Sequence, residues 1–225
     1  ITSINYGIGA VRDTGWSLGR KRAYINLERE TYDLGDDVGD RTSTLLYPGY
    51  TLTLQKADDL LNTRKGVSAS VDVHGASESL GSSVDFVQAK VTGNAVLPLT
   101  SKSRLLLRSQ FGAIEVDDFD ELPPSQRFFT GGDRTVRGYG YQQISPENAD
   151  GDNIGGRYLA VGSIEADYKV YKDYGLAAFF DVGDVANTTS FDLKRGVGIG
   201  FRWASPVGQI RLDLAHPLDD PDSDF

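Results

Sequence analysis

Apolar and polar side chains alternate without a break through Val67-Ser68-Ala69-Ser70-Val71-Asp72-Val73-His74. A period of two indicates a β-strand, because successive side chains of an extended chain point to opposite faces of a sheet. One face of this segment carries only Val and Ala, and the other carries only polar groups. The stretch therefore predicts a strand that separates an apolar environment from a polar one.

The same period recurs along the whole chain. Further alternating segments cover residues 4–11, 23–32, 50–55, 87–99, 105–113, 158–169, 174–182, 197–203 and 210–214. Together with 67–74 they make about ten strands, each of a length that can cross a bilayer when tilted. No apolar run approaches the roughly 18 residues that a membrane-spanning helix needs. The pattern predicts an all-β fold, an antiparallel transmembrane β-barrel of the outer-membrane type.

Short and long connections alternate between these segments. Residues 99–102 and 205–208 make tight turns, whereas residues 117–156 form one long polar connection. Short turns at one rim and long loops at the other are typical of outer-membrane barrels. Aromatic side chains also lie near the expected strand ends, where they would form an interfacial girdle; they are Tyr168, Tyr171, Tyr174 and Trp203. The alternative is a soluble β-sandwich or lipocalin-like barrel, but Gly198, Gly200 and Arg202 on the polar face favour a wet lumen.

The composition of the chain narrows the range of possible functions. The 225 residues carry a net charge of −9, which argues against a nucleic-acid surface. Acidic residues gather in expected loops at 33–40, 115–121, 147–152 and 219–224. We interpret them as solvated loop tips, with a cation-bridged contact to lipopolysaccharide as the alternative. The chain contains no Met, which indicates a mature or truncated protein.

The long connection contains the segment Arg127-Phe128-Phe129-Thr130-Gly131-Gly132-Asp133-Arg134-Thr135-Val136-Arg137-Gly138-Tyr139. It resembles the signature of the BamA/TamA assembly-and-translocation superfamily, in which an aromatic and a Gly pair precede Val-Arg-Gly-aromatic in the sixth extracellular loop. The matching motif residues are Phe129, Gly131, Gly132, Val136, Arg137, Gly138 and Tyr139. Similar downstream context occurs at 162–165, 180–183, 202–208 and 211–213. The flanks, Asp133-Arg134 and 141–146, are more similar to TamA than to BamA.

The resemblance implies an organisation for the chain. Members of the family have sixteen strands preceded by periplasmic POTRA domains. We therefore expect residues 1–225 to form one partial barrel domain, the C-terminal part without its final strand, which would begin near Phe225. Residues 117–156 would be an extracellular loop that folds into the lumen. A closed ten-strand barrel is the second choice.

Strand parity adds two candidate partners for the loop. Ile164 is predicted to face lipid, so Glu165 faces the lumen, and Phe180 likewise places Asp181 in the lumen. An Arg in that lumen needs acidic partners. We therefore hypothesise an Arg137–Glu165–Asp181 cluster that pins the loop, as the resemblance also implies.

The rest of the motif fits this hypothesis. Gly131, Gly132 and Gly138 permit left-handed backbone, and Tyr139 would pack beside the anchor. The alternative is that Arg137 caps loop carbonyls in solvent.

No catalytic constellation stands out. His74 shares a face with Ser68 and Ser70, but nothing marks a nucleophile, and His216 precedes Pro217 near a strand end. No spacing of metal ligands occurs. We therefore expect neither enzyme activity nor a metal or cofactor.

The resemblance implies a protein of the bacterial outer membrane that inserts or translocates other proteins, autotransporters in particular, through a lateral seam in the barrel. Its partners would be unfolded outer-membrane client proteins, an inner-membrane-anchored TamB-like protein and outer-membrane lipids, without nucleic acid. The alternatives are a two-partner-secretion exporter and a passive porin-like channel.

Overall fold

The computed structural model, which describes residues 2–35, 39–59, 62–206 and 208–220, contains a single ten-stranded sheet. The strands are β1 (Thr2–Trp16), β2 (Gly19–Asp33), β3 (Arg41–Ala57), β4 (Gly66–Ala76), β5 (Phe86–Pro98), β6 (Ser103–Val116), β7 (Tyr158–Tyr171), β8 (Tyr174–Ala186), β9 (Lys194–Ser205) and β10 (Gly208–Pro217). Two short 3₁₀ turns, η1 (Glu78–Leu80) and η2 (Pro124–Gln126), lie in the connections. Strand order follows the chain, and every neighbouring pair is antiparallel. The predicted all-β antiparallel fold is confirmed.

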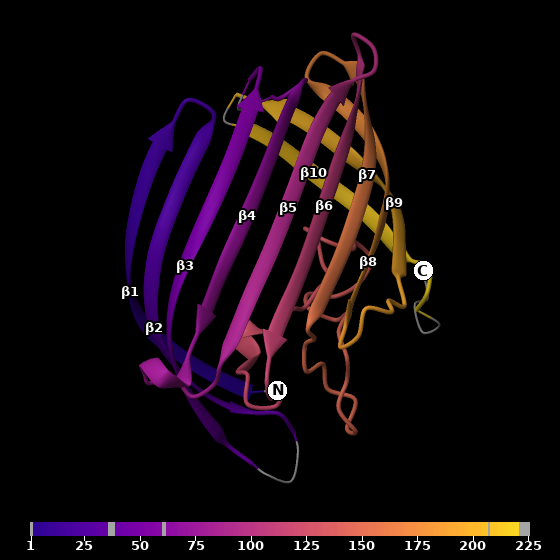
Figure 1. The fold of residues 1–225 in the computed structure, drawn as a ribbon. Coiled ribbons are helices and arrows are strands. Elements are labelled where there is room, and N and C mark those ends of the chain that lie inside the picture. Colours follow the sequence, from indigo (N-terminus) through magenta and orange to yellow (C-terminus); the bar gives the residue numbers. More distant parts are fainter. Residues whose placement is uncertain (1, 36–38, 60–61, 207, 221–225) are drawn as a thin grey trace.

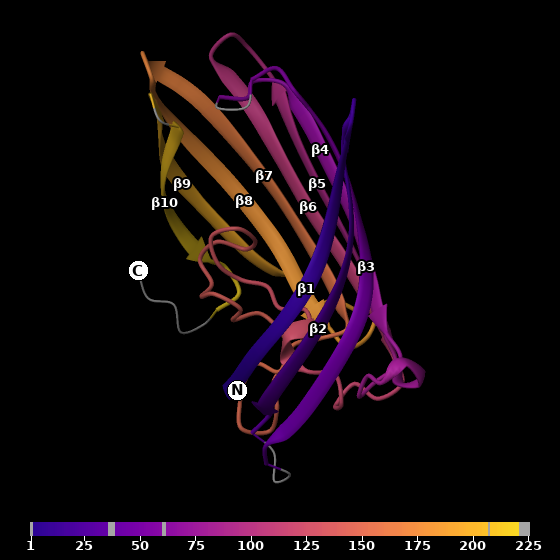
Figure 2. The same cartoon turned by 90° about the vertical axis from the view of Figure 1, so that its left-hand side faces the viewer.

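The sheet curls strongly, so that β1 and β10 lie on opposite sides of a concave interior (Figures 1 and 2). Most of its strands are longer than the alternation predicts. The largest difference is β3, which has 17 residues and begins at Arg41 rather than near Tyr50. Pro48 and Gly49 interrupt the sequence pattern there, but Gly49 leaves room for the ring of Tyr24 on the neighbouring strand. Packing between strands overrides the local signal.

The two faces of the sheet differ in chemistry. The convex face exposes large apolar side chains from end to end, for example Ile8 at 75%, Val67 at 56% and Leu214 at 75%. The concave face carries buried charged groups such as Glu165 and Arg202. The described residues include no helix long and apolar enough to cross a membrane.

A hydrophobic core fills the interior at the end of the sheet where the long connection lies. Leu122 and Phe128 of that connection pack with Leu45, Phe86 and Ile114 of the strands. Residues 221–225 lie outside the described residues, and with them Phe225, where the sequence predicts the start of a final strand. Residues 36–38 of the acidic stretch 33–40 also lie outside.

Candidate functional site

The connection between β6 and β7 folds back against the concave face of the sheet instead of extending away from it (Figure 2). Three isolated β-bridges hold it in shape, pairing Phe128 with Gly156, Thr130 with Ile144, and Glu147 with Asn153. We call residues 117–157 the inner loop. Its middle part carries the motif from Phe129 to Tyr139.

Arg137 projects from the inner loop into a ring of carboxylates. Its Nε and Nη2 donate to the two oxygens of Asp181 at 2.6 and 3.0 Å, and its backbone N–H donates to the same group at 3.1 Å. Its Nη1 donates to Glu165 at 2.7 Å and to Asp213 at 3.0 Å. The guanidinium also lies 3.4 Å from the ring centroid of Phe179. Arg137 is 4% exposed and Asp181 is fully buried.

Burial would lower the pKa of Arg137, but the hydrogen bonds to Asp181 and Glu165 outweigh burial and raise the pKa above its ordinary value. The fork geometry of the guanidinium suits this arrangement, because it meets one carboxylate with two parallel donors and still reaches others. The structure thus brings together the three residues named by the anchor hypothesis and places Asp213 beside them. We call Arg137, Glu165, Asp181 and Asp213 the anchor cluster.

Further charged groups surround the anchor cluster. Arg202 donates to Glu165 at 2.8 Å and also contacts Asp213, and Arg211 donates to Glu165 at 2.5 Å. Ser163 donates to Asp181 at 2.5 Å. Each buried carboxylate therefore has several donors, which offsets the cost of removing it from water.

Glycines let the inner loop approach the wall. Gly131, Gly132 and Gly138 all have φ near +100°, a region that favours Gly because it has no Cβ. On β9, Gly196 faces the backbone carbonyl of Arg137, and a Cβ at this position would collide with that oxygen.

The apolar motif residues lie close to the anchor cluster. Val136 and Tyr139 form a small buried cluster with Ile144. The ring of Phe129 lies over Gly155, in the returning part of the inner loop.

A second contact joins the inner loop to the opposite part of the wall, through η2. Gln126 donates to Glu28 at 3.2 Å, while its Oε1 lies 3.2 Å from Nε2 of His74. Gln88 donates to the backbone oxygen of Gln126 at 2.5 Å. His74 also lies 2.9 Å from Asp72 through Nδ1. Both nitrogens of His74 are thus occupied by structural partners, and neither faces a Ser.

Arg127 makes the contacts with loop carbonyls that the alternative hypothesis assigned to Arg137, but it is buried rather than in solvent. Its guanidinium donates to the carbonyls of Leu122, Phe119 and Ile154 at 2.8, 3.0 and 3.1 Å, and it lies over the ring of Phe119. Burial lowers the pKa of Arg127 to about 10. Two arginines ten positions apart therefore play different roles, one capping loop carbonyls and the other pairing with carboxylates.

The family model for the Omp85 superfamily domain matches residues 4–225. The chain belongs to the Omp85 superfamily.

Curated Omp85 relatives include the outer membrane protein assembly factor BamA of Nitratidesulfovibrio vulgaris, which is 29% identical over 95% of this chain and 28% of the relative. BamA of Neorickettsia risticii is 27% identical over 79% of this chain and 25% of the relative. The chain thus spans about a quarter of the length of these two relatives. A crystal structure of BamA from Haemophilus ducreyi lacking POTRA domains 1–3 has the same fold, with a TM-score of 0.82, 16% identity, and coverage of 98% of this chain and 52% of that one.

Membership of the Omp85 superfamily explains why the two faces of the sheet differ in chemistry. Omp85 domains are outer-membrane β-barrels, so the chain lies in the bacterial outer membrane, its convex face contacts lipid, and the concave face borders the lumen. Within the described ranges, no group of His, Asp and Glu side chains could hold a metal ion. The curated relatives are assembly factors rather than enzymes.

Sequence reasoning did not identify Asp213, Arg202 and Arg211 as members of the site. A signal for them exists, because they alternate with Ile210, Leu212 and Phe201, which are exposed on the lipid side. Parity places them in the lumen, but it does not say that β10 comes near Arg137.

Proposed function

We propose that this chain forms the barrel of an outer-membrane protein assembly factor, which inserts unfolded client proteins into the outer membrane. The observation that carries the proposal is the anchor cluster, a buried ionic contact that fixes the inner loop inside an Omp85 barrel. Relatives that share the domain are named as assembly factors of this kind.

The geometry supports the assembly of client proteins better than the passive diffusion of solutes through a porin-like channel. The inner loop contacts strands on both sides of the lumen, through Arg137 at β7, β8 and β10 and through Gln126 at β2, β4 and β5. A loop that crosses the lumen in this way obstructs an open channel. We propose that residues 117–156 are an extracellular loop that folds into the lumen. We also propose that the anchor cluster keeps the barrel wall in shape while a strand of the client pairs with a strand edge at a lateral seam of the barrel. An unpaired strand edge is a template for an incoming strand.

The test uses the full-length protein reconstituted in liposomes with an unfolded β-barrel client. Folding of the client is followed by the shift in gel mobility of unheated samples. We expect wild-type protein to accelerate folding, Arg137→Ala to reduce the acceleration, and Arg134→Ala, an exposed neighbour, to keep it. Ion conductance without any acceleration of client folding would overturn the proposal in favour of a porin-like channel.

We also propose which kind of assembly factor the protein is. The flanks of the motif, Asp133-Arg134 and 141–146, support a TamA-like factor with autotransporter clients and an inner-membrane-anchored TamB-like partner. Affinity purification of the full-length protein from cell envelopes tests it. Recovery of a partner that spans the periplasm supports the TamA-like role. The role is contradicted if no such partner is recovered and depletion of the protein causes a general loss of outer-membrane proteins.

A further inference from the structure

The convex, lipid-facing side of the sheet is largely apolar near the rim where the strands turn tightly, which we call the short-turn rim. The connections β1–β2, β3–β4, β5–β6, β7–β8 and β9–β10 gather there, at the upper end of the barrel in Figure 1. One large exposed apolar or aromatic side chain close to this rim comes from each of six strands: Val67, Leu97, Tyr168, Leu176, Phe201 and Ile210.

The hairpin of β1 and β2 departs from this pattern, because it carries Arg12 and Lys21 on the lipid-facing side. Side chains an even number of positions apart in a strand share a face. Arg12 therefore lies on the face of Ile8, which is 75% exposed, and Lys21 on the face of Ile25, which is 45% exposed. The antiparallel register pairs Thr14 with Lys21. Arg12 and Lys21 are thus diagonal neighbours across the hairpin, about 7–8 Å apart.

The carboxylate nearest to these two cations in the sequence points to the other face. Asp13 accepts hydrogen bonds from Nε and Nη2 of Arg22 at 2.8 and 3.0 Å, and Arg22 borders a cavity in the lumen. Among the described residues, neither Arg12 nor Lys21 has an ion-pair partner. Two like charges side by side repel each other. An anion that approaches from the lipid side would relieve this repulsion.

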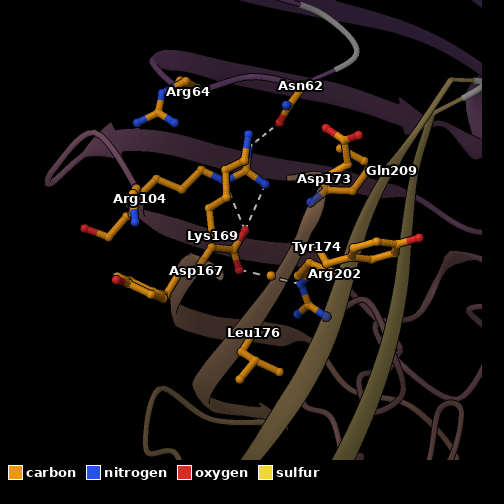
Figure 3. Close-up of a pocket in the computed structure, with 15 residues that line it drawn as sticks. Asn62, Arg64, Arg104, Asp167, Lys169, Asp173, Tyr174, Leu176, Arg202 and Gln209 are labelled. Atoms are coloured by element: carbon orange, nitrogen blue, oxygen red, sulfur yellow. Dashed lines mark hydrogen bonds and ion pairs between the residues drawn. The ribbon is translucent and has the colours of Figure 1, made fainter. Parts of the chain in front are cut away.

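Basic groups on the lumen side near the same rim do have acidic partners. Arg104 donates to Asp167 at 2.8 and 3.0 Å and to Asn62 at 3.2 Å, so it lies between these two side chains (Figure 3). Arg202 is paired with Glu165 at 2.8 Å. The chain thus neutralises these lumen arginines itself, whereas the lipid-facing pair keeps a charge of +2.

Aromatic side chains place Arg12 and Lys21 at the level of the lipid headgroups. Trp16 shares the face of Arg12 and is 40% exposed, and Nζ of Lys21 lies 5.5 Å from the centroid of its ring. Tyr50 of β3 is 46% exposed. Exposed Trp and Tyr of membrane proteins concentrate at the level of the headgroups. Long basic side chains extend their stems along apolar surface and bring their charge to that level.

We propose that Arg12 and Lys21 bind the phosphate of an anionic phospholipid in the leaflet that meets the short-turn rim. The guanidinium and the ammonium donate charge-assisted hydrogen bonds to the phosphate oxygens, and the acyl chains lie along Ile8 and Ile25. The phosphate removes the repulsion between the two cations, and the bound lipid holds the β1–β2 hairpin at a fixed depth. This inference rests on the outer-membrane barrel and is independent of which clients the protein handles.

The test uses the fluorescence of Trp16 in the full-length protein, reconstituted in vesicles of phosphatidylglycerol and phosphatidylethanolamine in equal amounts. Bromine on the acyl chains of one of the two lipids quenches a Trp that lies beside that lipid. The contribution of Trp16 is the difference between wild type and the Trp16→Phe variant. We expect brominated phosphatidylglycerol to quench Trp16 more than brominated phosphatidylethanolamine does.

The double variant Arg12→Gln, Lys21→Gln should quench equally with both lipids. The reason is that each cation at a membrane surface strengthens the binding of anionic lipid about fivefold. The matched control Arg20→Gln, Arg134→Gln removes the same charge from the lumen side and should keep the preference for phosphatidylglycerol.

Three outcomes would overturn the proposal. The first is equal quenching of wild type by the two lipids, and the second is a preference that persists in the double variant. The third is loss of the preference in excess inorganic phosphate but not in sodium chloride of the same ionic strength, which would indicate a site for the free anion. If the double variant does not fold, Lys21→Gln is measured alone, and an unchanged preference contradicts the proposal.

Discussion

The inner loop contacts the barrel wall on two sides, and the two contacts differ in chemistry. Toward β7–β10 the contact is ionic, because Arg137 is enclosed by Asp181, Glu165 and Asp213. Toward β2–β5 it is made of hydrogen bonds around Gln126 and of apolar packing, in which Leu122 and Phe128 of the loop join wall residues such as Leu45 and Phe86 in one core.

We infer that the ionic contact toward β7–β10 fixes the position of the inner loop, whereas the contact toward β2–β5 only supports it. A buried ion cluster depends on all its members, since removing one leaves the opposite charge without compensation. A contact built from several hydrogen bonds loses strength in small steps. We therefore expect the two sides of the inner loop to respond unequally to mutation.

The largest effect is expected for Arg137→Ala, which leaves Asp181 buried without its main partner and removes one of the three arginines that donate to Glu165. We expect the free energy of unfolding of the full-length protein to fall by about 3–5 kcal/mol. Urea unfolding in lipid vesicles measures it, with the exposed Arg134→Ala as the control. Equal stabilities of Arg137→Ala and wild type would remove the distinction between the two sides.

A double-mutant cycle measures the ionic contact directly. Arg137→Ala and Asp181→Ala should be strongly non-additive, with a coupling energy of about 1–3 kcal/mol, because each removes the same interaction. The same cycle with Glu165→Ala should also show coupling. Simple addition of the single effects would contradict a shared cluster.

Close approach on the ionic side is tested by Gly196→Ala, whose methyl group would collide with the carbonyl of Arg137. Overpacking of this kind should cost about 1–3 kcal/mol of unfolding free energy. Gly162→Ala is the control, because its methyl group would make only ordinary contact with Val182. A harmless Gly196→Ala would mean that the loop backbone shifts freely at this wall.

The smallest effect is expected on the other side, for Gln126→Ala. This change removes the hydrogen bonds to Glu28 and His74 but leaves the backbone oxygen that accepts from Gln88. The expected loss is about 0.5–1.5 kcal/mol in the same unfolding assay. A loss as large as that of Arg137→Ala would show that both contacts fix the loop.

The alternation of residue types by itself determined the ten strands and which side chains share a face. Exposed Ile164 and Phe180 place Glu165 and Asp181 on the lumen side, and both carboxylates lie there. Lipid on one side and water on the other impose a period of two, so this information is local in the chain. The motif from Phe129 to Tyr139 indicated the segment that carries Arg137.

Only the tertiary structure decided which distant groups meet. Asp213 lies 76 positions from Arg137, and Gln126 lies 52 positions from His74, yet both pairs are in contact. Parity gives the direction of a side chain but not its neighbours across the lumen. Those neighbours depend on how strongly the sheet curls and on where the inner loop turns, and both result from packing among strands that are far apart in the sequence.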